Sequence, residues 1–249
     1  MLYTPFVLGV AAARHVPWTL LLLLAAVTLL FIARESMVLW LRAVRQRQDP
    51  GQLGRQLAIQ VLLAAACGAV LAGREHRLEL LPLGAFAALL FGMQFVQLRR
   101  REQRTMSAEI LAILGLTSTA PAAFCVARGG WSATAAWLWV LSALYFASSV
   151  FYVKLRVADL QPRRAAQQRT LRGATAAYHL VLAGCVAALV VRHTFGWLLV
   201  VGFGPILART AWALRYPART VSLRRVGVLE ILYSLAFLVC TAWAVHPRA

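Results

Sequence analysis

The sequence predicts an all-α fold: a polytopic membrane helix bundle of about nine membrane-embedded helices, in a single membrane domain over residues 1–249. Of the 249 residues, 61% are hydrophobic and only 14% are charged, whereas soluble domains carry about 25% charged residues. The apolar residues are collected in runs of about 20, the length that crosses ~30 Å of hydrocarbon. Backbone groups in lipid must be satisfied within the chain, so such runs form helices. The ~10-residue alternating segments of a β-barrel are absent.

Charged residues bound nine apolar runs, and each run is an expected helix. The first run, MLYTPFVLGVAAA, is too short to span a membrane alone and is either a half-helix or part of a longer one. The other eight are long enough to cross. The expected helices cover 1–13, 16–36, 54–73, 78–98, 107–127, 131–153, 173–191, 194–214 and 226–246.

The connections between the runs alternate between short and long, and positive charge follows the long ones. The chain has 26 Lys and Arg against 8 Asp and Glu, a net charge of +18, and twenty of these basic residues lie at the long-loop ends. The positive-inside rule places the long loops in the cytoplasm of a bacterial inner (plasma) membrane, with the N-terminus inside and the C-terminus outside. Charge that follows topology in this way predicts membrane lipids as partners and no nucleic acid.

Three of the runs contain helix breakers. The stretch GLTSTAP places Pro121 after several Ser and Thr residues, and Pro205 and Pro82 interrupt two other runs. Proline removes a helix hydrogen bond, and a nearby Ser or Thr can satisfy the carbonyl that is freed. Two interpretations are open: kinks that serve packing, or kinked helices that line a cavity.

Ionisable residues inside or at the ends of membrane helices are costly, so each is a candidate for function. The candidates gather at the cytoplasmic ends of their helices, where convergence would form a cationic funnel. Arginine binds phosphate with two parallel hydrogen bonds, so the funnel predicts a lipid or isoprenoid phosphate as ligand. The expected ligand-binding residues are Arg34, Glu35, Arg104, Glu109, Lys154 and Arg209, and the expected catalytic residues are His179 and Glu230.

Most of these candidates also have a structural interpretation. Glu109 can stabilise the start of its helix, where a carboxylate meets the favourable end of the dipole. Lys154 can extend to the membrane interface. His179 can be a hydrogen-bonded core residue or an acid–base group, and Arg209 can pair with Glu230.

A basic, amphipathic stretch, SMVLWLRAVRQRQD, follows the second run. It can form a helix that rests on the head groups, with Trp40 as an anchor. Alternatively, it can cover a cytoplasmic pocket as a lid. Both interpretations place it outside the second membrane helix.

Common catalytic and metal-binding motifs are missing from the sequence. It contains no HExxH, P-loop, GxSxG or CxxC pattern and no aspartate pair at DxxxD spacing. The only aspartates are Asp49 and Asp159, so a magnesium–diphosphate site built on aspartates is not predicted. We expect no metal site, and the sequence identifies no cofactor.

Several stretches resemble the YwiC-like family of bacterial integral membrane proteins. They are TMSAEILAILGLTSTAPAAFCVARGG, LWVLSALYFASSVFYVKLR, the Tyr178-His179 pair and RVGVLEILYSLAF. The resemblance extends over nearly the whole chain. Members of the family usually begin with a segment that contains an EHGAW-type motif, and this sequence opens at MLYTPFVLG, just beyond it.

The chain is also distantly similar to the UbiA prenyltransferase superfamily, in its nine helices, its topology and its proline-kinked fifth helix. That resemblance implies a UbiA-like fold, with aspartate-rich motifs for magnesium and prenyl diphosphate after helices two and six. At those places this chain reads RESMVLWLRAVRQRQD and SSVFYVKLRVAD. Basic residues largely replace the aspartates, which argues against ordinary magnesium-dependent prenyl transfer.

Three hypotheses for function follow. The first is a membrane protein that binds a lipid or isoprenoid phosphate at a basic cytoplasmic-side cavity without catalysis. The second is a UbiA-related, prenyltransferase-like enzyme with an atypical, aspartate-poor site. The third is a membrane transport or assembly component. None of them specifies an oligomeric state.

The topology can be tested with a reporter fused after Ala249. If the long loops are cytoplasmic, the C-terminus lies outside, because eight full spans follow the first run. We therefore expect alkaline phosphatase at this position to be active and green fluorescent protein to be dark. The opposite pattern would show that the predicted orientation is inverted.

Overall fold

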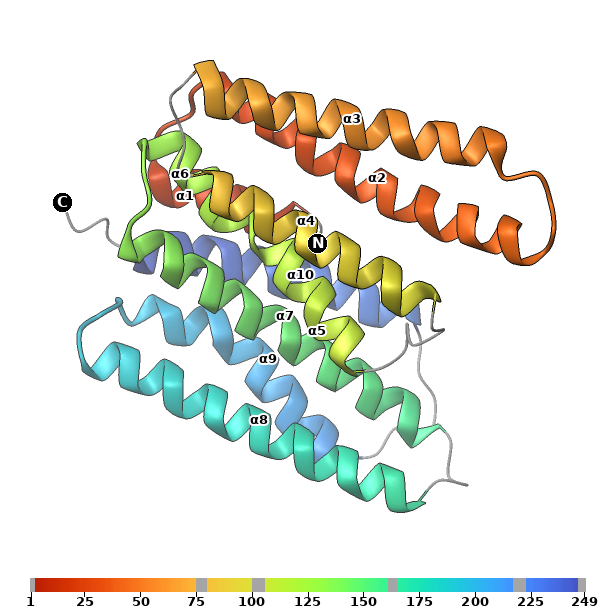
Figure 1. Cartoon of the computed structure of the whole chain (residues 1–249). Helices are drawn as coiled ribbons and strands as arrows, with labels where there is room; N and C mark the ends of the chain where they lie inside the picture. The colour runs from red at the N-terminus through yellow and green to blue at the C-terminus, as the bar shows by residue number, and fades with distance from the viewer. Residues whose placement is uncertain (1–2, 75–79, 100–105, 161–164, 217–222, 246–249) are drawn as a thin grey trace.

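A computed structural model describes residues 3–74, 80–99, 106–160, 165–216 and 223–245. This part of the chain contains ten helices and no strands, and the helices run side by side (Figure 1). Eight spans are long and apolar enough to cross a membrane, and α5 and α6 together make one of them. The helices are α1 (Thr4–Ala13), α2 (Thr19–Arg45), α3 (Gly51–Arg74), α4 (Leu80–Arg99), α5 (Met106–Thr117), α6 (Thr119–Arg128), α7 (Ala133–Asp159), α8 (Ala165–Val191), α9 (Leu198–Arg215) and α10 (Leu223–Ala244).

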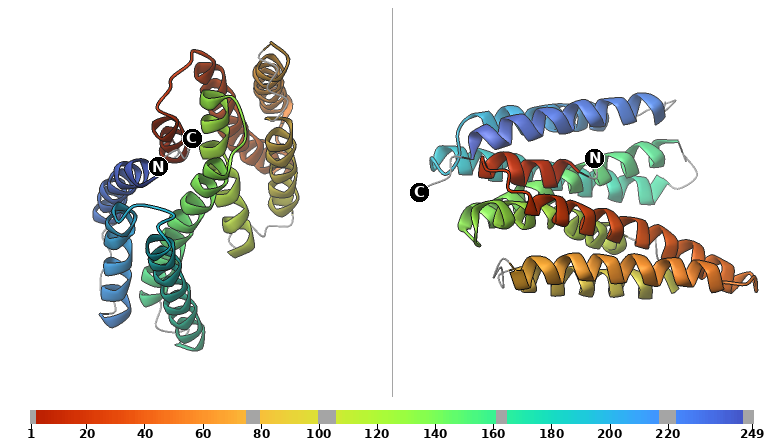
Figure 2. Two further views of the ribbon diagram at one scale, coloured as in Figure 1. Left: turned by 90° about the vertical axis from the view of Figure 1, so that its left-hand side faces the viewer. Right: turned by 90° about the horizontal axis from the view of Figure 1, so that it is seen from above.

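Helix α1 is a half-length helix held inside the bundle. Its ten residues rise only ~15 Å, about half the thickness of the hydrocarbon. In Figure 2 it lies beside the long helices and covers one half of their length. It packs against α6, α7 and α10, and Leu8 is completely buried. The prediction that this run cannot span alone is confirmed.

Helix α2 continues further than the sequence predicts. It runs unbroken to Arg45, so 36–45 continues α2 and does not form a separate helix on the head groups. Met37 and Leu41 pack against Leu98 of α4. Nη2 of Arg45 donates to the carbonyl oxygens of Leu98, at 2.6 Å, and Arg99, at 2.9 Å, which satisfies the open end of α4. These contacts hold the polar end of α2 in a helix beyond the hydrocarbon.

The break between α5 and α6 falls at the predicted proline. Pro121 has no N–H to offer to the preceding turn, and the chain leaves the helix at Ser118. The hydroxyls of Thr117, Ser118 and Thr119 donate back to the carbonyls of Ile113, Gly115 and Leu116, at 2.7–2.8 Å. The hydroxyls of Ser118 and Thr119 therefore supply donors to two carbonyls in the last turn of α5. The carbonyl that Pro121 itself leaves without a helix donor is that of Thr117, and none of these three hydrogen bonds goes to it. Pro205 lies inside α9, and that helix continues through it.

An aromatic cluster in the middle of the bundle joins α7, α9 and α10. The ring of Tyr145 stacks on Phe237, with centroids 4.1 Å apart, and Phe203 meets Phe237 edge-on at 5.3 Å. All three side chains are completely buried. Gly202 of α9 faces the Cβ of Cys240, where a methyl group would come within 3.1 Å. The missing side chain lets α9 and α10 approach closely.

Gly9 permits a close approach of α1 to the backbone of α6, and Gly9→Ala tests it. A Cβ at this position would overlap the carbonyl oxygen of Ala120 in α6, so we expect a loss of roughly 1–3 kcal/mol from overpacking. Gly68→Ala is the control, because a Cβ there meets no atom within 4 Å and should add up to ~1 kcal/mol through helix propensity. Thermal unfolding in detergent measures both. Equal melting temperatures for the two variants would contradict the packing of α1 on α6.

Candidate functional site

Seven polar side chains lie along one face of α7, Ser142, Tyr145, Ser148, Ser149, Tyr152, Arg156 and Asp159. Their spacing is mostly three, four or seven residues, so they fall within one arc of the helix. This face meets α8, α9 and α10. It carries the polar contacts of the candidate site.

The centre of the site is an ion pair between two membrane helices. Nη1 of Arg209 in α9 donates to Oε1 of Glu230 in α10, and the two side chains are only 7% and 6% exposed. The hydroxyl of Ser149 donates to Oε2 of Glu230 at 2.9 Å. The guanidinium lies over the ring of Tyr152, 3.9 Å from its centroid. Each buried charge is thus compensated, as its location between membrane helices requires.

One edge of the Arg209 guanidinium is unused. Its Nε and Nη2 are buried and have no hydrogen-bond partner in the described part of the chain. These two N–H groups point the same way, and together they form the fork that binds a carboxylate or phosphate through two parallel hydrogen bonds. Buried donors without partners are rare in proteins and cost about 1–3 kcal/mol each. The free edge is therefore ready to accept an oxyanion.

His179 of α8 lies next to this ion pair and is fully hydrogen-bonded. Its Nδ1 is 2.8 Å from the carbonyl oxygen of Thr175, which can only accept, so Nδ1 carries a proton. Its Nε2 is 2.8 Å from the hydroxyl of Ser148 and 3.1 Å from that of Thr210. The imidazole is buried, and its hydrogen bonds to Ser148 and Thr210 connect α8 with α7 and α9.

Other predicted residues form separate pairs. Lys154 binds Glu109 of α5 at 2.8 Å, on the opposite side of α7 from Tyr152, since two residues turn a helix by about 200°. Arg34 binds Glu35 at 2.6 Å and Gln94 of α4 at 3.1 Å, beside a small hollow between α2, α4 and α5. Arg104 lies outside the described residues. The prediction of one convergent funnel is therefore wrong for the described candidates.

The structure also shows a polar cluster that the sequence did not predict. Asp159 of α7 is completely buried and pairs with Arg172 of α8 at 3.1 Å and with Arg156 at 3.6 Å. The same two arginines donate to carbonyl oxygens at the end of α9, Arg156 to Tyr216 and Arg172 to Leu214. We call Asp159, Arg156 and Arg172 the long-loop clamp. The spacing of Arg156 and Asp159 was visible in the sequence, but the partner on α8 was not.

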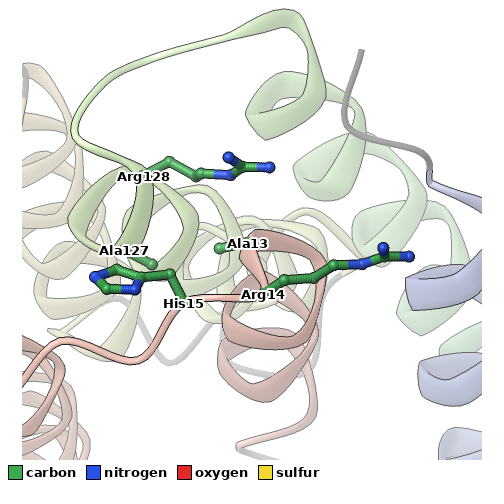
Figure 3. Close-up of a pocket in the computed structure, with 5 residues that line it drawn as sticks. All are labelled: Ala13, Arg14, His15, Ala127 and Arg128. Carbon is green, nitrogen blue, oxygen red and sulfur yellow. The ribbon is translucent and has the colours of Figure 1, made fainter. Parts of the chain in front are cut away.

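A depression at the opposite end of the bundle is lined by Ala13, Arg14, His15, Ala127 and Arg128. Its three basic side chains are exposed, and the ring of His15 points away from both guanidinium groups (Figure 3). Nothing there converges on a ligand. Among the described residues, no three His, Cys, Asp or Glu side chains gather as a metal site would require.

The long-loop clamp can be tested with Asp159→Asn. Loss of the carboxylate leaves two partly buried arginines without their anion, and we expect a cost of roughly 3 kcal/mol. Asp49→Asn is the control, because Asp49 is exposed and the asparagine oxygen can still accept the hydrogen bond from the backbone N–H of Gly51, so we expect little change in stability. Thermal unfolding of the purified variants in detergent compares the two. A smaller effect for Asp159 than for Asp49 would show that the clamp does not stabilise the bundle.

Comparison with known proteins identifies the first half of the chain. Residues 1–124 match the family model described as YwiC-like protein, a shorter part than the resemblance in the sequence predicts. No curated protein and no solved structure matches the chain, and the similarity to the UbiA superfamily stays a prediction. The match ends within α6, and the Arg209–Glu230 pair lies beyond it. This multi-pass helical membrane protein belongs to the YwiC-like family.

Proposed function

We propose that the protein binds the anionic head group of a lipid or isoprenoid phosphate inside the bundle, without catalysis, and that Arg209 holds this group. The observation that carries the proposal is the unused, buried edge of the Arg209 guanidinium. Glu230 at Nη1 and the ring of Tyr152 against the face of the guanidinium hold this edge in place, and Ser149 in turn holds Glu230. A preorganised arginine loses little freedom when it binds.

The location of Arg209 favours an amphipathic ligand over a free ion. The residue lies in a helix long and apolar enough to cross a membrane, with its side chain almost completely buried. A phosphate that is attached to an apolar chain can reach such a site while the chain stays in lipid. The two N–H groups of the free edge match two oxygens of the phosphate.

A UbiA-related transferase is less well supported by this site. Prenyl transfer of that kind depends on several carboxylates that hold magnesium. Glu230 is the carboxylate in contact with Arg209, and both of its oxygens already accept hydrogen bonds. In α2, which carries 34–45, Arg34 pairs with Glu35 of the same helix, and Arg34 and Arg45 donate to α4.

Transport is a second candidate function, and one observation favours it. The polar face of α7 extends from Ser142 to Asp159, which is ~26 Å of helix and most of the thickness of the hydrocarbon. A path along this face would pass the Arg209–Glu230 pair. Binding at Arg209 is common to both functions.

The binding site can be tested with farnesyl phosphate and dihexanoyl phosphatidylglycerol, which represent the isoprenoid and glycerolipid sources. Farnesol and dihexanoylglycerol, which lack the phosphate, are the ligand controls. We expect Arg209→Lys to weaken phosphate-dependent binding at least ~10-fold, because lysine keeps the charge but loses the two-pronged edge. Calorimetry or native mass spectrometry of the purified protein measures the change.

Arg215→Lys is the matched control, since Arg215 lies on the same helix and is exposed. It should leave binding unchanged. Equal binding by the wild type and Arg209→Lys, or equal binding of farnesol and farnesyl phosphate, would contradict the proposed site. Release of diphosphate from farnesyl diphosphate in the presence of magnesium would favour the transferase instead.

A further inference from the structure

We infer that an anion which binds to Arg209 brings a proton into the site with it, and that Glu230 receives this proton. The inference rests on the proposed function and adds a coupling between the ligand and protons. It depends on the charges that face one another across α7, α8, α9 and α10.

The site without ligand has no net charge. Arg209 carries one positive charge and Glu230 one negative charge. His179 of α8 bonds to two hydroxyls and one carbonyl and to no carboxylate, and we count it as neutral. The other titratable groups that face the pair are the phenols of Tyr145 and Tyr152 from α7 and Tyr233 from α10, which are uncharged near neutral pH.

The long-loop clamp is the next charged group along α7. Its Arg156 lies one turn beyond Tyr152, with the guanidinium 5.5 Å from the centroid of the Tyr152 ring, and its Asp159 lies about two turns beyond Tyr152 and pairs with both arginines. An apolar layer of Leu155, Ala213 and Val226 packs beside Tyr152 toward that end. The Arg156 guanidinium is engaged with Asp159 and with the carbonyl oxygen of Tyr216, so its partners lie outside the Arg209–Glu230 pair.

An added anion would leave an uncompensated negative charge. When a phosphodiester with one charge binds to the free edge, two anions share one guanidinium inside a poorly polarisable site. Burial of an unpaired charge costs far more than protonation of a nearby carboxylate, so such groups take up a proton. Uptake of one proton restores zero net charge.

The geometry points to Glu230 as the group that takes the proton. It is the carboxylate that would share Arg209 with the ligand, at the place where the two negative charges repel most strongly. A bound proton comes from bulk water and converts the carboxylate to a carboxylic acid, and no other bond changes. Either oxygen of the acid can still accept from Ser149, whose hydroxyl already donates to it at 2.9 Å.

The experiment is calorimetry of the whole protein in buffers with different ionisation enthalpies. The probes are dihexanoyl phosphatidylglycerol and the monomethyl ester of farnesyl phosphate, which carry one negative charge at every pH used. We expect the wild type to take up about one proton per bound probe near neutral pH, and its affinity to fall about tenfold for each unit of pH increase. The wild-type measurement alone can overturn the inference, so it does not depend on the folding of any variant.

Two variants show which residue takes up the proton. Glu230→Gln mimics the protonated side chain, so we expect tighter binding at high pH and no proton uptake. His179→Asn should still take up about one proton, since the histidine is not the acceptor. Binding that requires Arg209 but takes up no proton in the wild type would overturn the inference and leave the proposed function intact. If His179→Asn abolishes proton uptake and Glu230→Gln does not, the inference is likewise overturned and the proposed function is left intact. Absence of Arg209-dependent binding for both probes would overturn both.

Discussion

A charge buried between membrane helices needs its partner within the protein, because hydrocarbon supplies neither counter-ions nor hydrogen bonds. The pair of Arg209 and Glu230 meets this need and thereby sets the relative positions of α9 and α10. Ser149 and Tyr152 add α7 to the pair through a hydrogen bond and a ring contact. This pair and the long-loop clamp therefore set the register of the helices in the C-terminal half of the chain, whereas apolar packing alone would allow many similar registers.

Close approach of the backbones makes this arrangement possible. Gly202 brings α9 against α10, and the stacked rings of Tyr145 and Phe237 fill the space one turn from the polar site. The half-length α1 packs against both α7 and α10. Small residues, rings and a short helix thus surround the site, and Nε and Nη2 of Arg209 are buried within it. The unused edge of the guanidinium results from this close packing, and on this edge the proposed binding of an anion depends.

Hydropathy predicted the eight spans because membrane thickness sets the length of an apolar run. The Arg209–Glu230 pair was predictable too, since both residues lie at a similar depth in otherwise apolar helices. The single funnel failed because sequence position gives depth but not the side of the helix, and Lys154 faces α5. The extension of α2 was missed since an amphipathic basic stretch suits a helix on the head groups as well as one that packs on Leu98. The Arg172 partner of Asp159 comes from another helix, which local spacing cannot reveal.

Two groups border the Arg209 site, the aromatic cluster on one side and the long-loop clamp on the other, and they differ in how easily they could open for a ligand. Toward the short loops, Tyr145, Phe203 and Phe237 are completely buried and pack ring on ring. To part them would break apolar contacts that nothing replaces in the middle of the bundle. Toward the long loops, the clamp joins the helices through ion pairs and carbonyl contacts, with Arg172 partly exposed. Opening the clamp would separate the buried Asp159 from its arginines, but water and head groups can replace part of these contacts, whereas nothing replaces the ring contacts. We therefore expect a ligand to reach Arg209 past Asp159. The basic residues concentrated at that end would attract the anionic ligands that the free guanidinium edge can bind.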